Sequence, residues 1–395
     1  MTDSAPTPLK GLKVVEFTHM VMGPAVGHIL AGLGADVVRI EPIGGDRTRR
    51  LLGSGAGYFP MYNRGKRSIC LNLKSEDGLA VAKDLVAGAD ILVENFRPGA
   101  LDRLGLGYEP CAADNPQLIY CSEKGFLPGP YEERTALDEV AQMMGGLAYM
   151  TGPPGKPLRA GASVIDVTGG MFGVIGVLAA LEERHRTGRG QKVVASLFET
   201  TAYLVGQHMA QFAVTGTPAA PMPTRVSAWA IYDVFETKDE PVFIGVVTDA
   251  LWQKFCALFG LDELWADQSI RENNARVQAR DRIMPQIRTL IGDMTRDEVI
   301  AKLDGTGLPF APIGKPEELF DDPQLAKGGM EPVTLADGTD TRLPTIPLEM
   351  GGKRPVRAHA MPAPGADSRD VLTALGYAED RIERLLSAGA VGETL

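Results

Sequence analysis

Short apolar runs alternate with longer amphipathic stretches along the first two hundred residues. The runs at 13–17, 37–40 and 90–93 are rich in Val, Ile, Leu and Phe, as buried strands are. Between them, at 23–33 and 77–89, apolar residues recur at helical spacing. Strands that alternate with helices predict βαβ units around a parallel sheet, so we expect an α/β domain here. Further strands are predicted at 68–73, 118–122 and 191–198.

The most apolar stretch of the chain runs from Met171 to Leu181. Apolar and small residues cover most of its surface at helical spacing, which predicts a buried helix. Basic side chains follow at 184–186, and Gly188 is placed to end the helix. Asp166 precedes this run, where a loop enters the helix.

Two interpretations of Asp166 are open from the residues alone. An Asp at the mouth of a helix caps free backbone N–H groups. The positive end of the helix dipole also favours the charged form, so we expect Asp166 to be ionised near neutral pH. Gly169 and Gly170 would leave its open side accessible, and their N–H groups are candidates to support an oxyanion. Such a carboxylate suits covalent catalysis on an activated acyl group.

The character of the chain changes near residue 214, where a Pro- and Thr-rich stretch begins. We expect a large α/β domain over 1–213, a linker over 214–226, a small α+β domain over 227–327, and a return segment over 328–395 that completes the large domain. The small domain is predicted to hold strands at 229–236 and 241–247, and helices near 250–260, 280–293 and 296–303. A helical segment at 137–150 is predicted in the large domain.

Composition narrows the class of protein. The 395 residues are 44% hydrophobic and 23% charged, which describes a globular protein with a large core. The net charge of −10 argues against nucleic acid as a partner. Four scattered cysteines fit a reducing compartment, and no apolar signal core or membrane-length run is apparent. We therefore expect a cytoplasmic protein without a membrane or a metal site.

Two features suggest an anionic ligand. A basic cluster between residues 47 and 67 is interpreted as a phosphate site; its members are Arg47, Arg49, Arg50, Arg64, Lys66 and Arg67. In addition, Glu41 ends the second strand of a βαβ unit, where an acid can bind ribose. The glycine fingerprint of dinucleotide-binding turns is missing, so an NAD-dependent oxidoreductase is the weaker alternative.

Ordered motifs over nearly the whole chain resemble the class III CoA-transferases, the family of formyl-CoA transferase and carnitine CoA-transferase. The resemblance centres on Asp166, Gly170 and the segment Thr187-Gly188-Arg189-Gly190-Gln191. It also includes Gly11-Leu12-Lys13-Val14, Gly23-Pro24, Ile40-Glu41-Pro42, Asn63-Arg64-Gly65-Lys66-Arg67-Ser68 and Glu94-Asn95-Phe96-Arg97-Pro98-Gly99.

The resemblance implies a Rossmann-like large domain in an open-ring monomer that forms an interlocked homodimer. It also implies transfer of CoA from an acyl-CoA thioester to a free acid through a mixed anhydride on Asp166 and an aspartyl-CoA thioester. CoA is then a substrate, and no other cofactor or metal is needed. The positions that match CoA contacts in the family are His19, Leu71, Lys74, Asn95, Phe96 and Arg103.

Other outcomes within and outside the family are open. The related α-methylacyl-CoA racemases carry a His where this chain has Leu137, so one acid/base partner is absent and 2-methylacyl-CoA racemase activity is disfavoured. Formyl-CoA transferases carry Gln and Trp where this chain has Val21 and Leu51, which disfavours formate and oxalate. Succinyl-CoA with a small dicarboxylic acceptor is the expected substrate pair, and a nonenzymatic CoA-binding protein is a further alternative.

Overall fold

The computed structural model describes residues 5–225, 227–356 and 359–394. The chain divides into two compact units, the first built from the residues up to Pro223 together with those from Pro323 onward, the second spanning Thr224–Asp322. Helix α8 (Leu197–Thr215) continues past residue 213, where the large domain was expected to end. Residue 226 of the expected linker and residues 357–358 of the return segment lie outside the described residues.

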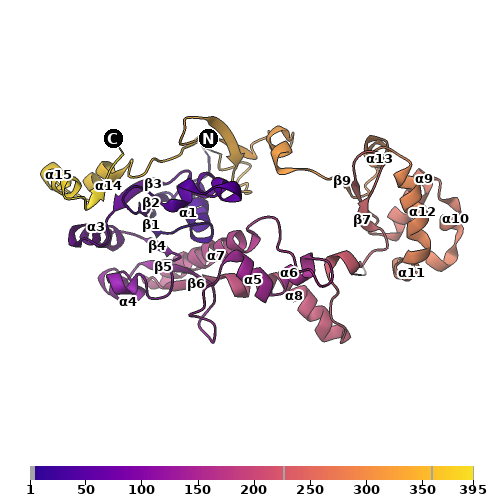
Figure 1. The fold of residues 1–395 in the computed structure, drawn as a ribbon, viewed down its shortest axis with the longest axis horizontal. Helices are drawn as coiled ribbons and strands as arrows, with labels where there is room; N and C mark the ends of the chain where they lie inside the picture. The colour runs from indigo at the N-terminus through magenta and orange to yellow at the C-terminus, as the bar shows by residue number, and fades with distance from the viewer. Residues whose placement is uncertain (1–4, 226, 357–358, 395) are drawn as a thin grey trace. The chain divides into compact units, whose positions relative to one another are not determined.

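The first unit is built on a seven-stranded sheet within the described part of the chain. Six strands are parallel and the edge strand β13 is antiparallel, which confirms the predicted parallel sheet. Six of the strands follow one another in Figure 1 from β3 at the top to β6 at the bottom. In spatial order the strands are β13 (Val391–Gly392), β3 (Arg67–Leu71), β2 (Asp36–Glu41), β1 (Lys13–Phe17), β4 (Ile91–Glu94), β5 (Ile119–Lys124) and β6 (Lys192–Ser196).

Helices cover both faces of this sheet because its parallel strands are apolar on both sides. On one face α1 (Met22–Gly32) and α7 (Val164–Thr187) share a core with Val14, Val37 and Ile91. On the other face the core includes Val15, Phe17 and residues of four helices. These are α3 (Glu76–Ala87), α4 (Tyr108–Asp114), α14 (Ser368–Ala374) and α15 (Glu379–Ser387).

The order 3-2-1-4-5-6 is that of a doubly wound Rossmann-like sheet. From β1 the chain adds strands β2 and β3 on one side, and from β4 it adds β5 and β6 on the other side. The loops that follow β1 and β4 therefore lead away from each other. Ligands of such sheets bind in the crevice that opens there, at the carboxyl ends of the strands. The residues after β1 and β4 include His19 and Asn95, so the fold brings two predicted site residues together.

Helix α7 is longer than predicted and is not buried all round. Gly188 ends it in the left-handed conformation, as expected (φ 72°). One side packs on α1 and the sheet, whereas Met171, Ile175 and Leu178 are exposed. By length and hydropathy α7 could cross a membrane, but its packed side forms part of the α/β core. The prediction of a fully buried helix is therefore wrong for this chain on its own.

Two other predictions near the site differ from the structure. The segment 137–150 forms two helices, α5 (Asp138–Met144) and α6 (Leu147–Thr151), because Gly145 and Gly146 separate them and Gly146 has a φ of 87°. The strand predicted at 191–198 ends at Ser196, and α8 begins at once. Helix α8 was not predicted at all.

The second unit is a small α+β body, as expected. Strands β7 (Tyr232–Phe235), β8 (Val242–Gly245) and β9 (Phe310–Pro312) form an antiparallel sheet over a core that includes Trp252 and Phe255. Thr295 and Glu298 form a capping box at the start of its last α-helix. The helices of this unit are α9 (Asp249–Phe259), α10 (Asp262–Ala266), α11 (Asn273–Gln278), α12 (Arg280–Gly292) and α13 (Arg296–Leu303).

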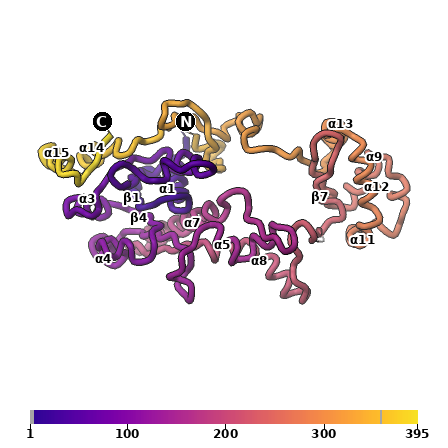
Figure 2. Tube along the Cα trace, viewed as in Figure 1, coloured from indigo at the N-terminus to yellow at the C-terminus, as the bar shows by residue number. Residues whose placement is uncertain are grey.

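The return segment rejoins the first unit, and Figure 2 allows its path to be followed to the C-terminus. It forms the small sheet of β10 (Met330–Thr334), β11 (Asp340–Pro344) and β12 (His359–Ala360). Buried Glu331 accepts a hydrogen bond from buried Arg64, which ties the segment to the N-terminal part of the chain. Strand β13 then pairs with β3, so the last residues complete the large sheet.

Candidate functional site

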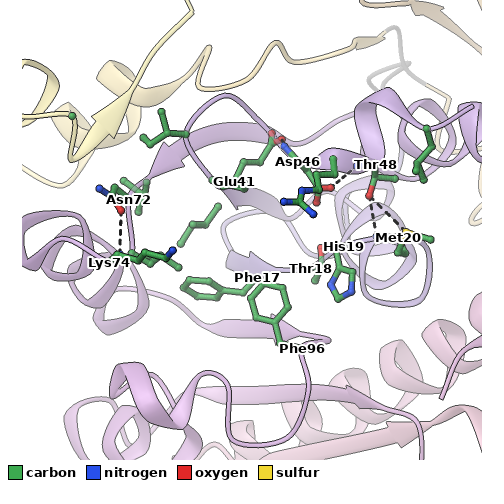
Figure 3. A pocket seen from close by; sticks show the side chains of 18 residues that line it. Phe17, Thr18, His19, Met20, Glu41, Asp46, Thr48, Asn72, Lys74 and Phe96 are labelled. Atoms are coloured by element: carbon green, nitrogen blue, oxygen red, sulfur yellow. Dashed lines mark hydrogen bonds between the residues drawn. The ribbon is translucent and has the colours of Figure 1, made fainter. Parts of the chain in front are cut away.

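A cavity of about 890 Å³ opens at the carboxyl ends of β1, β2 and β3. Four of the predicted CoA-contacting residues, His19, Leu71, Lys74 and Phe96, line it, and Figure 3 shows three of them labelled. The rings of His19 and Phe96 stack with their centroids 5.4 Å apart. Lys74 is exposed at the cavity and Arg47 also lines it, so two cations are available to an anionic ligand.

Asn95 acts on the backbone of the turn after β1. Its Oδ1 accepts a hydrogen bond from the N–H of His19, and its Nδ2 donates to the carbonyl of His19, both at 2.9 Å. The next residue, Met20, has a φ of 61°, a conformation that costs a non-glycine residue free energy. The hydroxyl of Thr48 accepts the Met20 N–H at 3.3 Å. Asn95 and Thr48 thus hold a strained turn at the cavity.

A smaller cavity of about 200 Å³ contains Asp166. His19 and Met20 line this cavity as well as the larger one, so the strained turn lies where the two meet. Asn95 lines the smaller cavity rather than the larger. Arg103 is exposed on the short turn η3 (Asp102–Leu104) and is not among the described residues that line either cavity.

Asp166 lies in the first turn of α7, but it does not cap the helix. The N-cap is Ser163, and the cap bonds come from Asp138 at the start of α5. The Oδ2 of Asp138 accepts the N–H of Ile165 at 2.9 Å and that of Asp166 at 3.2 Å. The side chain of Asp166 is therefore not used by its own helix end, and it lines the smaller cavity.

Burial is the main cause that raises the pKa of Asp166, to about 7. The charge of Asp138 raises the pKa further, and the charge of Arg159 opposes the change. The helix dipole was expected to keep Asp166 ionised, but desolvation outweighs it. Protonated and ionised forms of Asp166 therefore coexist near neutral pH, which is the range in which a carboxyl group can both accept and release a proton.

The comparisons with known proteins identify the family. The model of CoA-transferase family III matches residues 9–368. This chain belongs to CoA-transferase family III. It is 35% identical to an acetyl-CoA:oxalate CoA-transferase of Acetobacter aceti over 89% of this chain and 92% of that protein. It is 30% identical to a succinyl-CoA:glutarate CoA-transferase of Mus musculus over 97% of this chain and 90% of that protein.

A solved structure of the same family agrees. A CaiB/BaiF family protein from Brucella suis matches with a TM-score of 0.81 and 34% identity, over 94% of this chain and all of that one. The protein is therefore a CoA-transferase enzyme that uses an acyl-CoA and a carboxylate, as the resemblance implied. The nonenzymatic CoA-binding protein and the NAD-dependent oxidoreductase are set aside.

The predicted role of the two glycines after Asp166 is corrected by the structure. Gly169 and Gly170 lie inside α7, where backbone N–H groups donate to carbonyls four residues earlier, so they are not free for an oxyanion. A Cβ at Gly169 would approach Met22 Cε to 2.6 Å, and one at Gly170 would approach the Met22 carbonyl oxygen to 2.8 Å. The glycines instead let α7 pack closely on α1.

The predicted phosphate cluster is also mostly wrong, because this acidic chain pairs its cations internally. Arg49 contacts Glu41 at 2.5 Å, Lys66 contacts buried Glu16 at 2.8 Å, and Arg67 contacts Asp36 at 2.5 Å. Arg64 is paired with Glu331, and Arg50 donates to the Gly44 carbonyl at 3.1 Å. Only Arg47 of the six lines the larger cavity.

Two functional groups gave no sequence signal strong enough to find them. Asp138 lies in the first turn of its own helix, and through space it also caps a second helix. Glu123 at the end of β5 lines the smaller cavity, and its Oε1 accepts from the Cys121 thiol at 3.3 Å. Burial raises the pKa of Glu123 to about 8. Both depend on tertiary contacts that spacing along the chain does not encode.

Proposed function

We propose that this enzyme moves CoA from an acyl-CoA thioester to a free carboxylic acid, with Asp166 as the covalent nucleophile. One observation carries the proposal: the Asp166 carboxyl lines a cavity that meets a cofactor-sized cavity at His19 and Met20. A long ligand in the larger cavity can therefore present its end to Asp166. The reaction converts one thioester and one free carboxylate into another such pair, so it requires no ATP and no metal.

The larger cavity suits CoA by size and chemistry. Its apolar wall includes Leu71 and Phe96, and Lys74 and Arg47 are placed to meet phosphate groups. His19 would lie beside the thioester, since it borders both cavities. Arg103, being exposed and outside both linings, would reach only an extended part of the ligand.

The chemical steps follow from this placement. The ionised Asp166 attacks the thioester carbonyl, the C–S bond breaks, and CoA leaves as a thiolate while a mixed anhydride forms. The thiolate attacks the aspartyl carbonyl, which forms the aspartyl-CoA thioester and releases the first acid. The acceptor carboxylate attacks this thioester, and the same steps in reverse give the new acyl-CoA and free Asp166. Each step exchanges one acyl bond for another.

We further propose succinyl-CoA as the donor and a small dicarboxylic acid as the acceptor. The relatives above act on oxalate and on glutarate, which are both dicarboxylic acids. The smaller cavity, at about 200 Å³, has room for a short acid but not for a long acyl chain. Val21 and Leu51 support an acid other than oxalate, as argued from the sequence.

The proposed assembly is a homodimer of interlocked open rings. A group of exposed apolar side chains on the first unit supports a dimer, because exposed apolar patches mark surfaces at which chains associate. Its exposed side chains lie on α7 and α8 and include Met171, Ile175, Leu178, Tyr203, Leu204, Met209 and Phe212. Interlocked rings cannot separate without unfolding, so light scattering and circular dichroism across a urea series should show dissociation and loss of helix together. A folded monomer would contradict the assembly.

We place the enzyme in the cytoplasm. Its four cysteines are free and buried, which suits a reducing compartment. Burial raises the pKa of the Cys70 and Cys111 thiols to about 11, so both are poor nucleophiles and are not expected to form disulfides.

A paired screen tests the function. Acyl-CoA donors are mixed with free acids, and new acyl-CoA products are read by mass spectrometry for the wild type and for Asp166→Ala. The wild type should transfer CoA and the variant should not, while both keep the same circular dichroism spectrum. Full activity of Asp166→Ala would remove the nucleophile from the proposal, and no transfer by the wild type to any acid would contradict the function.

A further inference from the structure

Arg159 lies in the wall of the smaller cavity, between α6 and the start of α7. Its side chain is 28% exposed, so one side of the guanidinium is accessible. Its Nε and Nη2 donate to the carbonyls of Ala160 and Ala162, both at 3.1 Å. The loop therefore fixes the guanidinium plane before any ligand arrives.

The two carboxylates that pair with Arg159 differ in burial. Asp138 contacts Nη2 at 3.2 Å, its side chain is 7% exposed, and it also caps α7, so it cannot leave. Glu139 contacts Nη1 at 3.1 Å and its side chain is 59% exposed. An exposed ion pair contributes little free energy, because water solvates both partners. The carboxylate of Glu139 that contacts Nη1 can therefore be replaced by the carboxylate of a bound ligand.

Lys124, the other lysine or arginine among the described residues that line this cavity, is not available to a ligand. Its Nζ contacts buried Glu94 at 2.7 Å and donates to the Phe96 carbonyl at 2.7 Å. Among the described lining residues, Arg159 is therefore the permanent cation with an exchangeable partner.

Arg159 and Asp166 lie close together through a shared neighbour. One oxygen of Asp138 contacts the Arg159 Nη2, and the other accepts the N–H of Asp166 at 3.2 Å. The guanidinium and the backbone of Asp166 therefore contact the two oxygens of one carboxylate, and Arg159 and Asp166 line the same cavity. An acid whose first carboxyl group is at Asp166 can reach Arg159 with its second carboxyl group through a short spacer.

We propose that Arg159 determines specificity for dicarboxylic acids by binding the second carboxylate of the acid in place of Glu139. The ligand carboxylate accepts hydrogen bonds from Nη1, while Asp138 keeps its contact with Nη2. Arginine suits this task because its planar fork stays charged and matches carboxylate geometry. A monocarboxylic acid leaves the Glu139 pair intact and gains nothing. The inference rests on the proposed acyl transfer at Asp166 and names the feature of the acid that this site selects.

The test compares glutarate with valerate, which have the same chain length and differ in the second carboxylate. Acceptor kcat/KM is measured for both acids with one fixed acyl-CoA donor, in the wild type, Arg159→Met and Glu139→Gln. Arg159→Met should lower the glutarate-to-valerate ratio at least tenfold. Glu139→Gln should raise the ratio several-fold, because the competitor of the ligand carboxylate is neutralised. Arg159→Lys should restore part of the ratio, since it keeps the charge without the fork.

Each other result overturns the inference. A loss that is equal for both acids in Arg159→Met would show that Arg159 only supports the loop and Asp138. An unchanged ratio in Glu139→Gln would show that no exchange of partners occurs, and this exposed substitution decides the matter if Arg159→Met does not fold. Failure of the wild type to transfer CoA to either acid from any donor would instead contradict the proposed function itself.

Discussion

Replacing Asp166 by Asn should make the folded protein more stable at high pH while removing its activity. The carboxyl group has a pKa of about 7 in the folded chain, against an ordinary value of 3.8. Between these two values the folded state binds the proton more tightly than the unfolded state does. The stability of the wild type therefore falls as the pH rises through this window, and an amide, which cannot ionise, avoids the loss.

The size of the effect follows from the pKa difference. At about 1.4 kcal/mol for each pKa unit, the full cost of ionising the half-buried Asp166 is about 4 kcal/mol, as an upper limit. About 2.5 kcal/mol of this develops between pH 5 and pH 8. A domain of this size shifts its Tm by about 2 °C for each kcal/mol, so the gain in Asp166→Asn should be about 5 °C larger at pH 8 than at pH 5.

Thermal unfolding followed by circular dichroism at both pH values measures this difference directly. Asp77→Asn is the matched control, since Asp77 also lies in the first turn of a helix, α3, but is exposed. Its Tm should fall slightly at both pH values, because a helix N-terminus favours negative charge by a few tenths of a kcal/mol. An equal Tm gain for Asp166→Asn at pH 5 and pH 8 would refute the assignment of a raised pKa to the Asp166 carboxyl group.

Three further outcomes are expected. Gly170→Ala should destabilise the protein by about 1–3 kcal/mol and lower its Tm more than Gly169→Ala does, because its new Cβ meets a rigid backbone oxygen rather than a flexible side-chain end. Equal Tm values for the two variants would contradict this packing. Asp138→Asn should move the acid limb of the pH–rate profile to lower pH, because the charge that raises the pKa of Asp166 is removed; an unmoved limb would argue against their coupling. In deuterated water a chiral 2-methylacyl-CoA should gain negligible α-deuterium, since Leu137 cannot act as a base, and exchange as fast as transfer would favour a racemase.

The sequence predicts most of the sheet because its signal is local. Runs such as 13–17 and 90–93 are mostly apolar, which is typical of strands that are buried on both faces. Helix α8 was missed because its exposed apolar residues obscure the usual polar face. The break inside 137–150 was missed because two glycines in a small-residue run permit either one helix or two.

The site was predictable in its positions but not in its electrostatics. His19, Phe96 and Asp166 follow strands or begin a helix, so the topology alone places them at one edge of the sheet. The charge of Asp166 depends on burial and on Asp138, which comes from another helix. Likewise, Lys66 was predicted to bind phosphate, but in the structure it pairs with Glu16. Such partners are set by tertiary packing and leave no periodic pattern in the chain.

Chemical trapping of the covalent intermediate shows which side chain attacks the thioester. The wild type is incubated with an acyl-CoA donor, treated with hydroxylamine or borohydride, digested, and analysed by peptide mass spectrometry. We expect modification at Asp166, dependent on the acyl-CoA, and no modification in Asp166→Asn. Modification at Asp138, Glu139 or Glu123 instead, or the absence of any adduct while transfer proceeds, would contradict Asp166 as the nucleophile.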